Sequence, residues 1–291
     1  MAQEEVKKSH KGKLISIIFF IILLIALLFI YAKYVGIKGL IVKEYKIESN
    51  ILTSNFSGIK IVHFSDLLYK STTDKEDIKN LVSRINELKP DIVVFTGDLV
   101  NKNKKYSNDD IEFLEEQLTN INANIGKYAI YGDADYSFED YKTIIEKSKF
   151  NILNNSYDEV FYKNNDSLFI VGLPSSSKEE VKFEEAFNFY KEDEKRKYII
   201  VLAHDGKTIK LLDDTTYEVD LVLGGHSLNG SVVVPYYGGV FLDDLGDKYY
   251  QEHYSKGITE IYISSGIGTN KYPYRIFNKP SFNLYRLKAQ S

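Results

Sequence analysis

The sequence DIVVFTGDLV, residues 91–100, decides the fold class. Its first half is a continuous apolar run, which is typical of a strand that is buried on both faces of a sheet. The run ends in Gly97-Asp98, so a carboxylate stands at the carboxyl end of the strand. The preceding segment, residues 74–88, has apolar residues at helical spacing, begins with an acidic residue and is followed by Pro90. A helix followed by a buried strand with a polar end indicates an α/β fold.

The same alternation of strands and helices continues on both sides of this stretch. Several short apolar runs end in polar residues, and amphipathic segments lie between them. This rhythm predicts an α/β sandwich. Strands are predicted at residues 42–48, 60–64, 128–131, 167–173, 197–203, 219–223, 231–234 and 260–264, and helices at residues 109–121, 138–148 and 179–190.

Residue types that bind metals stand at five strand ends. They are Asp66, Asp98, Asp133 with Asp135, His204 and His226. A single aspartate after a strand is usually a turn or N-cap residue, but five such ends in succession favour one shared site. Carboxylates that converge on one cleft need a cation to neutralise them, unless some stay protonated. Carboxylate and imidazole ligands together suit Mn, Fe, Zn or Mg.

The order of these motifs resembles that of the calcineurin-like metallophosphoesterase superfamily, whose pattern is D-x-H, G-D, G-N-H-D/E, H and G-H-x-H. The corresponding segments here are residues 65–68, 97–100, 132–135, 202–205 and 225–228. The context is similar to a membrane-anchored bacterial branch, which carries D-I-V-V-x-T-G-D-L-V and, later, Y-I-S-x-G-I-G-T before P-x-R. The resemblance covers residues 45–288 and implies a four-layer αββα sandwich, in which helices flank two mixed sheets.

The motifs are degenerate, because three histidines of the family pattern are absent. Leu68 and Leu228 stand where the resemblance implies two ligands of one metal. Ala134 stands where it implies the histidine that protonates the leaving group, so no catalytic residue is retained at that position. Asp133 replaces an asparagine ligand. The second metal site that the resemblance implies keeps all of its possible ligands, which are Asp98, Asp133, His204 and His226.

Other residues near the motifs have weaker interpretations. Asp66 is a further candidate ligand, although its metal has lost two ligands and a role as a cap fits it equally well. Asp135 is expected to lie behind the ligands as a structural residue, because the histidine that it would orient is Ala134. Arg275 and Gly230 are candidate ligand-binding residues, the first for a phosphate and the second in a backbone nest for an anion. An ion pair inside the fold explains Arg275 equally well.

The N-terminal region contains a membrane-spanning pattern. The run from Leu14 to Ala32 has 19 residues, carries no charge and is interrupted only by Ser16 and Tyr31, and a bilayer core needs roughly 20 apolar residues. No small-residue cleavage site follows it. The lysines before the run favour a cytoplasmic N-terminus. We therefore expect a cytoplasmic tail at residues 1–13, a single-pass anchor at residues 14–34 and an extracytoplasmic phosphoesterase domain at residues 45–288, on the cell membrane.

Composition excludes several other classes of function. The net charge is −4 and no basic face stands out beyond the N-terminus, so a nucleic-acid partner is disfavoured. The chain has no cysteine, which excludes disulfides and thiol chemistry. The sequence identifies no protein partner.

The missing histidines predict a pseudoenzyme. Loss of one metal and of the proton donor should leave little phosphodiesterase activity, since a positioned acid alone contributes about 10²–10⁴ in rate. The domain would then hold one divalent metal and bind a small anionic or phosphate-bearing ligand, or a partner protein. Two alternatives stay open. One is an active phosphoesterase that uses a single metal on a phosphodiester or phospholipid-like substrate, and the other is a structural module without metal.

Overall fold

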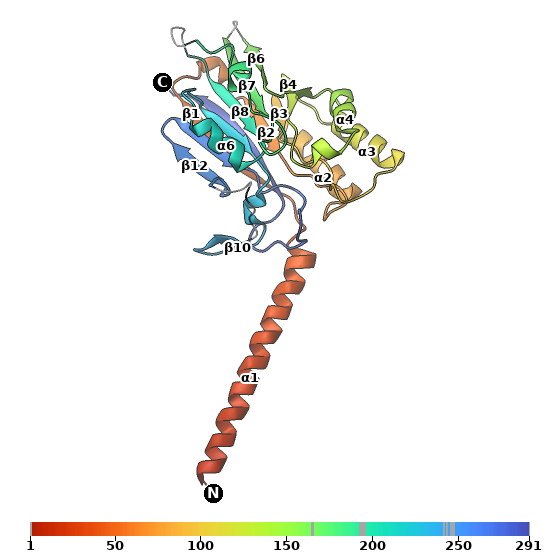
Figure 1. Cartoon of the computed structure of the whole chain (residues 1–291), viewed down its shortest axis with the longest axis vertical. Helices are drawn as coiled ribbons and strands as arrows, with labels where there is room; N and C mark the ends of the chain where they lie inside the picture. The colour runs from red at the N-terminus through yellow and green to blue at the C-terminus, as the bar shows by residue number, and fades with distance from the viewer. Residues whose placement is uncertain are drawn as a thin grey trace.

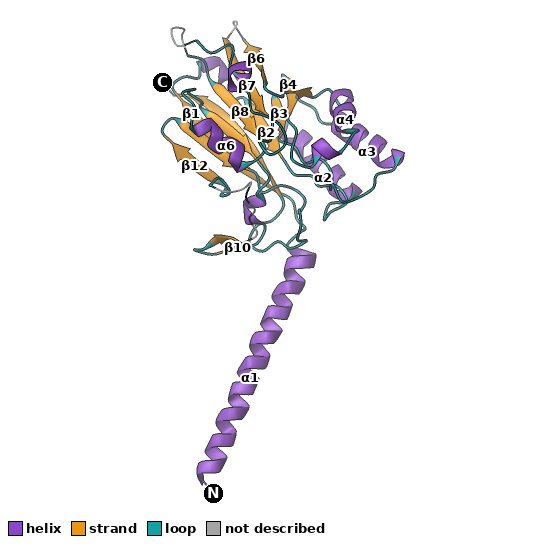
Figure 2. Ribbon diagram, in the orientation of Figure 1, coloured by secondary structure: helices purple, strands orange, loops and turns teal. Residues whose placement is uncertain are grey.

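The computed structural model describes residues 2–163, 166–191, 196–240, 242, 244 and 248–290, with side chains from residue 11 onward. Helix α1 (Ala2–Ile30) continues into a π-helical turn (Tyr31–Val35) and projects from the rest of the chain (Figure 1). The elements that follow form one α/β domain with helices on its outside (Figure 2).

Two six-stranded sheets form the centre of the domain. The first has the order β1 (Ile41–Ser49), β14 (Ser281–Ala289), β2 (Lys60–Phe64), β3 (Ile92–Phe95), β4 (Gly126–Ala129) and β5 (Asn151–Ile152). The second has the order β12 (His253–Lys256), β13 (Thr259–Ile263), β9 (Leu221–Gly224), β8 (Ile199–Ala203), β7 (Asp166–Leu173) and β6 (Ser156–Tyr162). Both sheets are mixed, because β14 runs antiparallel to β2 and the edge strands β12 and β6 run antiparallel to their neighbours.

Helices cover the outer face of each sheet, and the inner faces pack on each other. Helices α2 (Lys75–Leu88), α3 (Asn108–Thr119) and α4 (Tyr141–Lys147) share an apolar core with the first sheet. Helices α5 (Phe183–Ala186) and α6 (Gly206–Asp213) pack on the second sheet. A third core lies between the sheets and joins residues of both, such as Ile61 and Leu223. The predicted four-layer αββα sandwich is therefore confirmed.

Helix α2 shows how the local sequence sets an element. Asp74 caps its N-terminus by accepting hydrogen bonds from the amides of Glu76 and Asp77. Apolar residues four or three apart, among them Ile78 and Leu81, face the core. The helix ends at Leu88; the next residue, Lys89, has a left-handed φ of 50° and stands immediately before Pro90.

One predicted helix is much shorter than expected. Only Phe183–Ala186 of residues 179–190 is helical. The aromatic residues after it pack flat instead: the ring of Phe187 stacks on that of Tyr217 at 4.3 Å and the ring of Phe189 on that of Phe169 at 3.7 Å. Burial of these rings outweighs the helical propensity of the segment.

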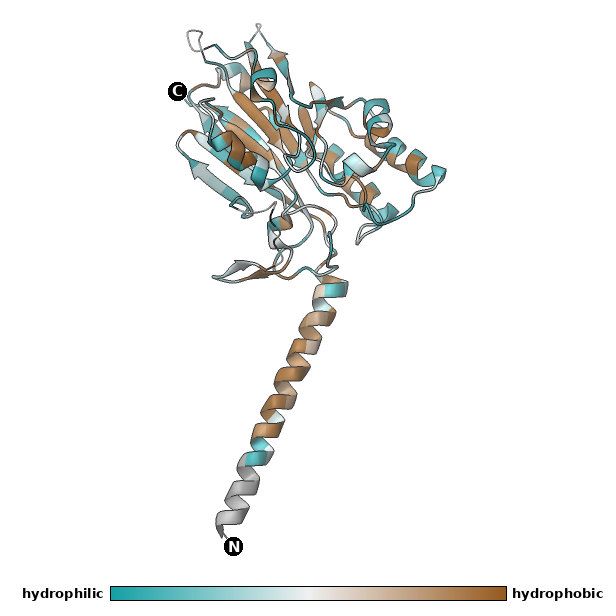
Figure 3. Ribbon diagram, in the orientation of Figure 1, coloured by the Kyte–Doolittle hydropathy of each residue, from teal (hydrophilic) through white to brown (hydrophobic). Residues whose placement is uncertain are grey.

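Within the described residues, one helix is long and apolar enough to cross a membrane, over Lys11–Val35. Its apolar side chains are exposed on all sides, and Figure 3 shows the apolar residues continuing along its length. The helix is thus not a core helix of the domain. Its C-terminal end is attached to the domain, because the amide of Arg275 donates to the carbonyl of Ala32 at 3.0 Å and the ring of Tyr274 lies edge-on to that of Phe29 at 6.0 Å.

Candidate metal centre

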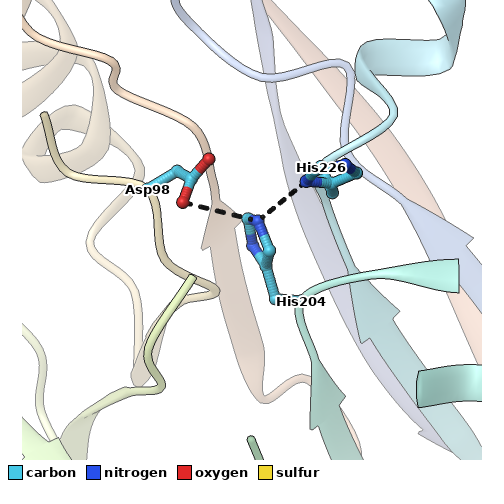
Figure 4. A group of neighbouring side chains, drawn as sticks. All are labelled: Asp98, His204 and His226. Carbon is cyan, nitrogen blue, oxygen red and sulfur yellow. Dashed lines mark hydrogen bonds and ion pairs between the residues drawn. The ribbon is translucent and has the colours of Figure 1, made fainter. Parts of the chain in front are cut away.

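Three strand ends from the two sheets bring Asp98, His204 and His226 together (Figure 4). Asp98 follows β3 in the first sheet, whereas His204 and His226 follow β8 and β9 in the second. Each offers one potential ligand atom, and these atoms all lie within 4.8 Å of one another. All three side chains are buried. The site therefore lies at the carboxyl ends of the central strands, between the sheets.

The glycines of the two G-D motifs allow this approach. Gly97 has a φ of +93°, and a Cβ atom on it would lie 2.2 Å from the amide nitrogen of Gly132. A Cβ atom on Gly132 would lie 2.3 Å from the amide nitrogen of Asp98. Only glycine fits where these two loops cross, which explains why each acidic residue follows a glycine.

A hydrogen bond to the backbone of Thr96 fixes the imidazole of His204. Its Nδ1 lies 2.6 Å from the carbonyl oxygen of Thr96 and donates to it, which leaves Nε2 with a free lone pair when the ring is neutral. Nε2 lies 3.5 Å from Oδ1 of Asp98 and 3.3 Å from Nδ1 of His226. Ligand atoms that face one another at these distances need a shared proton or a cation. A carboxylate and two imidazoles, one of them oriented through its second nitrogen, fit a divalent transition metal.

The electrostatics of the centre agree with this interpretation. Burial disfavours the charged form of Asp98, but the imidazoles of His204 and His226 outweigh it and lower the pKa of Asp98 below its usual value. Burial likewise disfavours a charged His204, but the carboxylates of Asp98 and Asp66 raise its pKa well above the usual value. In the metal-free protein a proton on His204 thus compensates the buried carboxylates. A metal that binds here must displace that proton, so its affinity falls as pH falls.

Asp66 lies next to the centre but supports the backbone around it. Its Oδ2 accepts hydrogen bonds from the hydroxyl of Ser65 at 2.5 Å and from the amide of His226 at 3.1 Å. A Cβ atom on Gly225 would lie 2.1 Å from the Ser65 hydroxyl, so the G-H motif needs its glycine for this contact. Burial raises the pKa of Asp66 above its usual value. Asp66 is outside the three-residue cluster, and its role as a ligand stays a prediction.

Leucine side chains occupy the side of the site where the resemblance implies the other metal. Leu68 and Leu228 are 2% and 3% exposed, and both have left-handed backbones, with φ of 45° and 51°. This conformation is unusual for leucine. Both lie against the loop that contains Gly266 and Gly268: a Cβ atom added to Gly266 would lie 2.4 Å from Leu228, and one added to Gly268 would lie 2.7 Å from Leu68. An apolar wall therefore closes this side.

Asp135 and Ala134 connect the two G-D loops. The carboxylate of Asp135 accepts hydrogen bonds from the amides of Asp98, Leu99 and Gly132 at 2.7–2.9 Å. Burial and the charge of Asp98 nevertheless raise the pKa of Asp135 to about 7. The amide of Ala134 donates to Oδ1 of Asp98 at 2.7 Å. Asp135 thus joins the backbones of the two G-D loops, and Ala134 contributes its amide to the same contact; the structural role of Asp135 stays a prediction.

Asp133 lies outside the cluster of the other three candidate ligands and pairs with two lysines. Its carboxylate lies 3.2 Å from Nζ of Lys102 and 3.3 Å from Nζ of Lys178, and it accepts a hydrogen bond from the hydroxyl of Ser177 at 2.9 Å. These partners outweigh burial and lower the pKa of Asp133 below its usual value. Its role as a ligand stays a prediction. Sequence reasoning missed the two lysines, since no motif marks them.

The structure places the two weaker candidates in structural positions. Arg275 is fully buried, and its guanidinium donates hydrogen bonds to the backbone carbonyls of Ser265, Gly266, Gly268 and Asn278. Gly230 has a φ of +81°, and a Cβ atom on it would lie 2.4 Å from Cα of Gly239. Both hold loops together here, and their role in ligand binding stays a prediction.

A pocket of about 320 Å³ lies beside the centre. Its lining includes His226, Ser227 and Leu228 together with Lys271 and Tyr272. An ammonium group and a hydroxyl beside a candidate metal ligand suit an anion.

Comparisons with known proteins agree with this geometry. The calcineurin-like phosphoesterase family matches residues 59–230. The chain is 30% identical to the uncharacterized metallophosphoesterase YkuE of Bacillus subtilis over 89% of both chains, and 28% identical to an uncharacterized metallophosphoesterase of Aquifex aeolicus over 86% of this chain and 92% of that one. The chain therefore belongs to the calcineurin-like metallophosphoesterase family.

Two further similarities are more distant. A Danio rerio protein described as a transmembrane protein with metallophosphoesterase domain is 24% identical over 85% of this chain and 57% of its own length. The crystal structure of calcineurin-like phosphoesterase YfkN from Bacillus subtilis aligns with 72% of this chain and 82% of that chain, at 16% identity and a TM-score of 0.43. The structural similarity is too weak to add to the family assignment.

Proposed function

We propose that this protein is a membrane-anchored member of the family that holds one divalent metal at Asp98, His204 and His226, with Asp133 as a further ligand. Hydrolysis of phosphodiesters is lost or strongly reduced, and the pocket beside His226 binds a phosphate-bearing ligand. One observation carries the proposal: the three-residue cluster is assembled, while Leu68 and Leu228 close the side where the family pattern has two more ligands.

The residues of the chain explain the expected loss of rate. A bound metal would supply positive charge to the oxygens of a phosphate. Asp98 and the two histidines would hold it, and the carbonyl of Thr96 keeps the lone pair of His204 directed at Asp98. At residue 134 a methyl group replaces the imidazole of the family pattern, so that position provides no proton for a leaving oxygen. Leu68 and Leu228 remove two of the ligands that the family pattern gives to a second cation there.

An active single-metal phosphoesterase is the second candidate. The pocket favours it, because Lys271 and Tyr272 line the same pocket as His226 and can hold a phosphate beside the metal position. The substrate would be a phosphodiester or a phospholipid-like molecule. The relatives are named metallophosphoesterases, which supports the same class of chemistry.

Membrane anchoring is the second part of the proposal. The large apolar side chains from Leu14 to Ile30 are exposed, and contact with the domain is confined to the C-terminal end of the helix at Phe29 and Ala32 in the described residues. Lys11 and Lys13 precede the uncharged run and Lys33 follows it, so charges mark both ends of a bilayer-sized segment. The transmembrane description of the Danio rerio relative supports the anchor. We infer an N-terminus in the cytoplasm and a domain outside it.

Hydrolysis of an aryl phosphodiester by the purified full-length protein with Mn²⁺ tests the proposal. The control is Asp98→Ala, which removes the carboxylate from the cluster. We expect wild-type turnover at the level of this control. If the wild type turns over the substrate and Asp98→Ala does not, the pseudoenzyme proposal is wrong and the protein is an active single-metal phosphoesterase.

A further inference from the structure

An uncharged apolar hairpin projects from the domain beside the end of helix α1. The sequence over residues 232–240, VVVPYYGGV, contains no charged residue, although 27% of the chain is charged. Its strands β10 (Val233–Val234) and β11 (Gly238–Gly239) pair antiparallel and carry the turn between them. Tyr236 is fully exposed and Tyr237 is 78% exposed. Exposed apolar side chains grouped in this way mark a contact surface.

Backbone hydrogen bonds connect this hairpin to the end of the membrane helix. The amide of Val233 donates to the carbonyl of Ile276 at 3.0 Å, and the adjacent amide of Arg275 donates to the carbonyl of Ala32 at 3.0 Å. The buried guanidinium of Arg275 holds the same loop through four carbonyls. Figure 1 shows β10 at the end of the domain where α1 joins it. The position of the hairpin relative to the helix is thus set by the fold.

The depth of the junction places this surface at a membrane boundary. Tyr274 contacts Phe29, which lies inside the apolar run, about one helical turn before Lys33. Phe277, 74% exposed, follows the residue that pairs with the hairpin. Two exposed lysines are close in sequence to these aromatic residues: Lys33 to Phe29 and Lys271 to Tyr274. Tyrosine, phenylalanine and lysine are the residue types that favour the interface between headgroups and acyl chains.

We propose that the hairpin of residues 232–240, together with Phe277, is a second membrane contact that lies in the headgroup region of the bilayer spanned by the helix. This inference rests on the proposed membrane anchor. The covering partner is a lipid surface and not a protein, because the loop of Arg275 and Ile276 joins the hairpin to the end of the spanning helix, where Tyr31 and Tyr34 are candidate interfacial residues.

The contact has a consequence for the ligand. Val240, the last residue of the hairpin, lines the pocket beside His226, and so does Leu242 two residues further along the chain. One end of the pocket therefore meets the proposed lipid contact. A lipid phosphate can enter the pocket while its acyl chains stay in the bilayer.

Tryptophan fluorescence tests the contact, because the chain has no tryptophan of its own. Each single variant of the full-length protein would be reconstituted in vesicles of phosphatidylcholine and phosphatidylglycerol, with or without bromine near the top of the acyl chains. Tyr236→Trp and Tyr237→Trp report on the hairpin. Phe20→Trp reports on the anchor, and Phe161→Trp, exposed on β6 at the opposite end of the domain, is the matched control.

We expect the brominated lipids to remove most of the emission of Phe20→Trp and of both hairpin variants and to leave that of Phe161→Trp unchanged. The proposal is overturned if both hairpin variants behave like Phe161→Trp while Phe20→Trp is quenched, and the hairpin would then be a protein-binding surface. If Phe20→Trp is not quenched either, the anchor itself is refuted and the second contact with it.

Discussion

Thermal unfolding of the Asp98→Ala variant, with and without metal, separates the ligands of the centre. In wild type, Mn²⁺ at roughly 100 times its dissociation constant adds about 2.7 kcal/mol to the free energy of unfolding. For a domain of this size that raises the Tm by roughly 5–10 °C. Asp98 supplies the carboxylate of the cluster, so its removal should abolish this increase.

The variant will also unfold more easily without metal. The Asp98 carboxylate accepts a hydrogen bond from the amide of Ala134 and faces Nε2 of His204. Its removal leaves these groups unpaired, which lowers the free energy of unfolding by about 1–3 kcal/mol. The informative quantity is therefore the change in Tm on adding Mn²⁺ to chelator-treated protein, not the Tm itself. Tyrosine fluorescence of the full-length protein in detergent reports the transition, since the chain has 23 tyrosines.

The Asp133→Ala variant is the matched comparison. Lys102, Lys178 and Ser177 already pair with the Asp133 carboxylate, so a metal gains less from it than from Asp98. We expect Asp133→Ala to keep the larger part of the Mn²⁺-dependent increase. The reasoning fails if Asp133→Ala abolishes the increase as completely as Asp98→Ala, or if Mn²⁺ leaves the wild-type Tm unchanged.

Two further predictions concern the lost site and the core. Leu68→His, Ala134→His and Leu228→His combined should restore a second metal and create or greatly raise phosphodiester hydrolysis, because a positioned acid alone contributes about 10²–10⁴ in rate; a folded triple variant that binds two metals and stays inert would contradict our account of the lost site. Burial lowers the pKa of His63 from its usual 6.5 to about 3. Between these two pH values His63 is protonated in the unfolded chain but not in the folded one, so the free energy of unfolding falls as pH falls from 6.5 towards 3. The loss amounts to about 2–3 kcal/mol between about pH 7 and pH 4.5, and denaturant unfolding of His63→Gln should show a smaller loss over that interval; an equal loss in both proteins would refute the assignment.

The sequence predicted the framework of the site because its signals are local. Each apolar run ends in a ligand-type residue, and the carboxyl ends of neighbouring parallel strands meet at one edge of a sheet, as those of β8 and β9 do at His204 and His226. Asp98 reaches them because the first sheet packs on the second. The long apolar helix over Lys11–Val35 was predictable for the same reason, since its length and its uncharged run are features of the local sequence.

The contacts that the sequence did not reveal are long-range. Lys102 and Lys178 reach Asp133 from segments without any motif, and four carbonyls surround Arg275 although its side chain looked suited to a phosphate. Aromatic stacking shortens the helix expected over residues 179–190. Tertiary packing decides such features, and neither periodicity nor spacing records it.

The metal content of the full-length protein, measured by mass spectrometry after saturation with Mn²⁺ and removal of free ion, tests the central claim most directly. Our account predicts one ion per chain in wild type and none in Asp98→Ala. Two ions per chain in wild type would show that the leucine side of the site still binds a metal, and no ion at all would leave the cluster of Asp98, His204 and His226 as a purely structural feature.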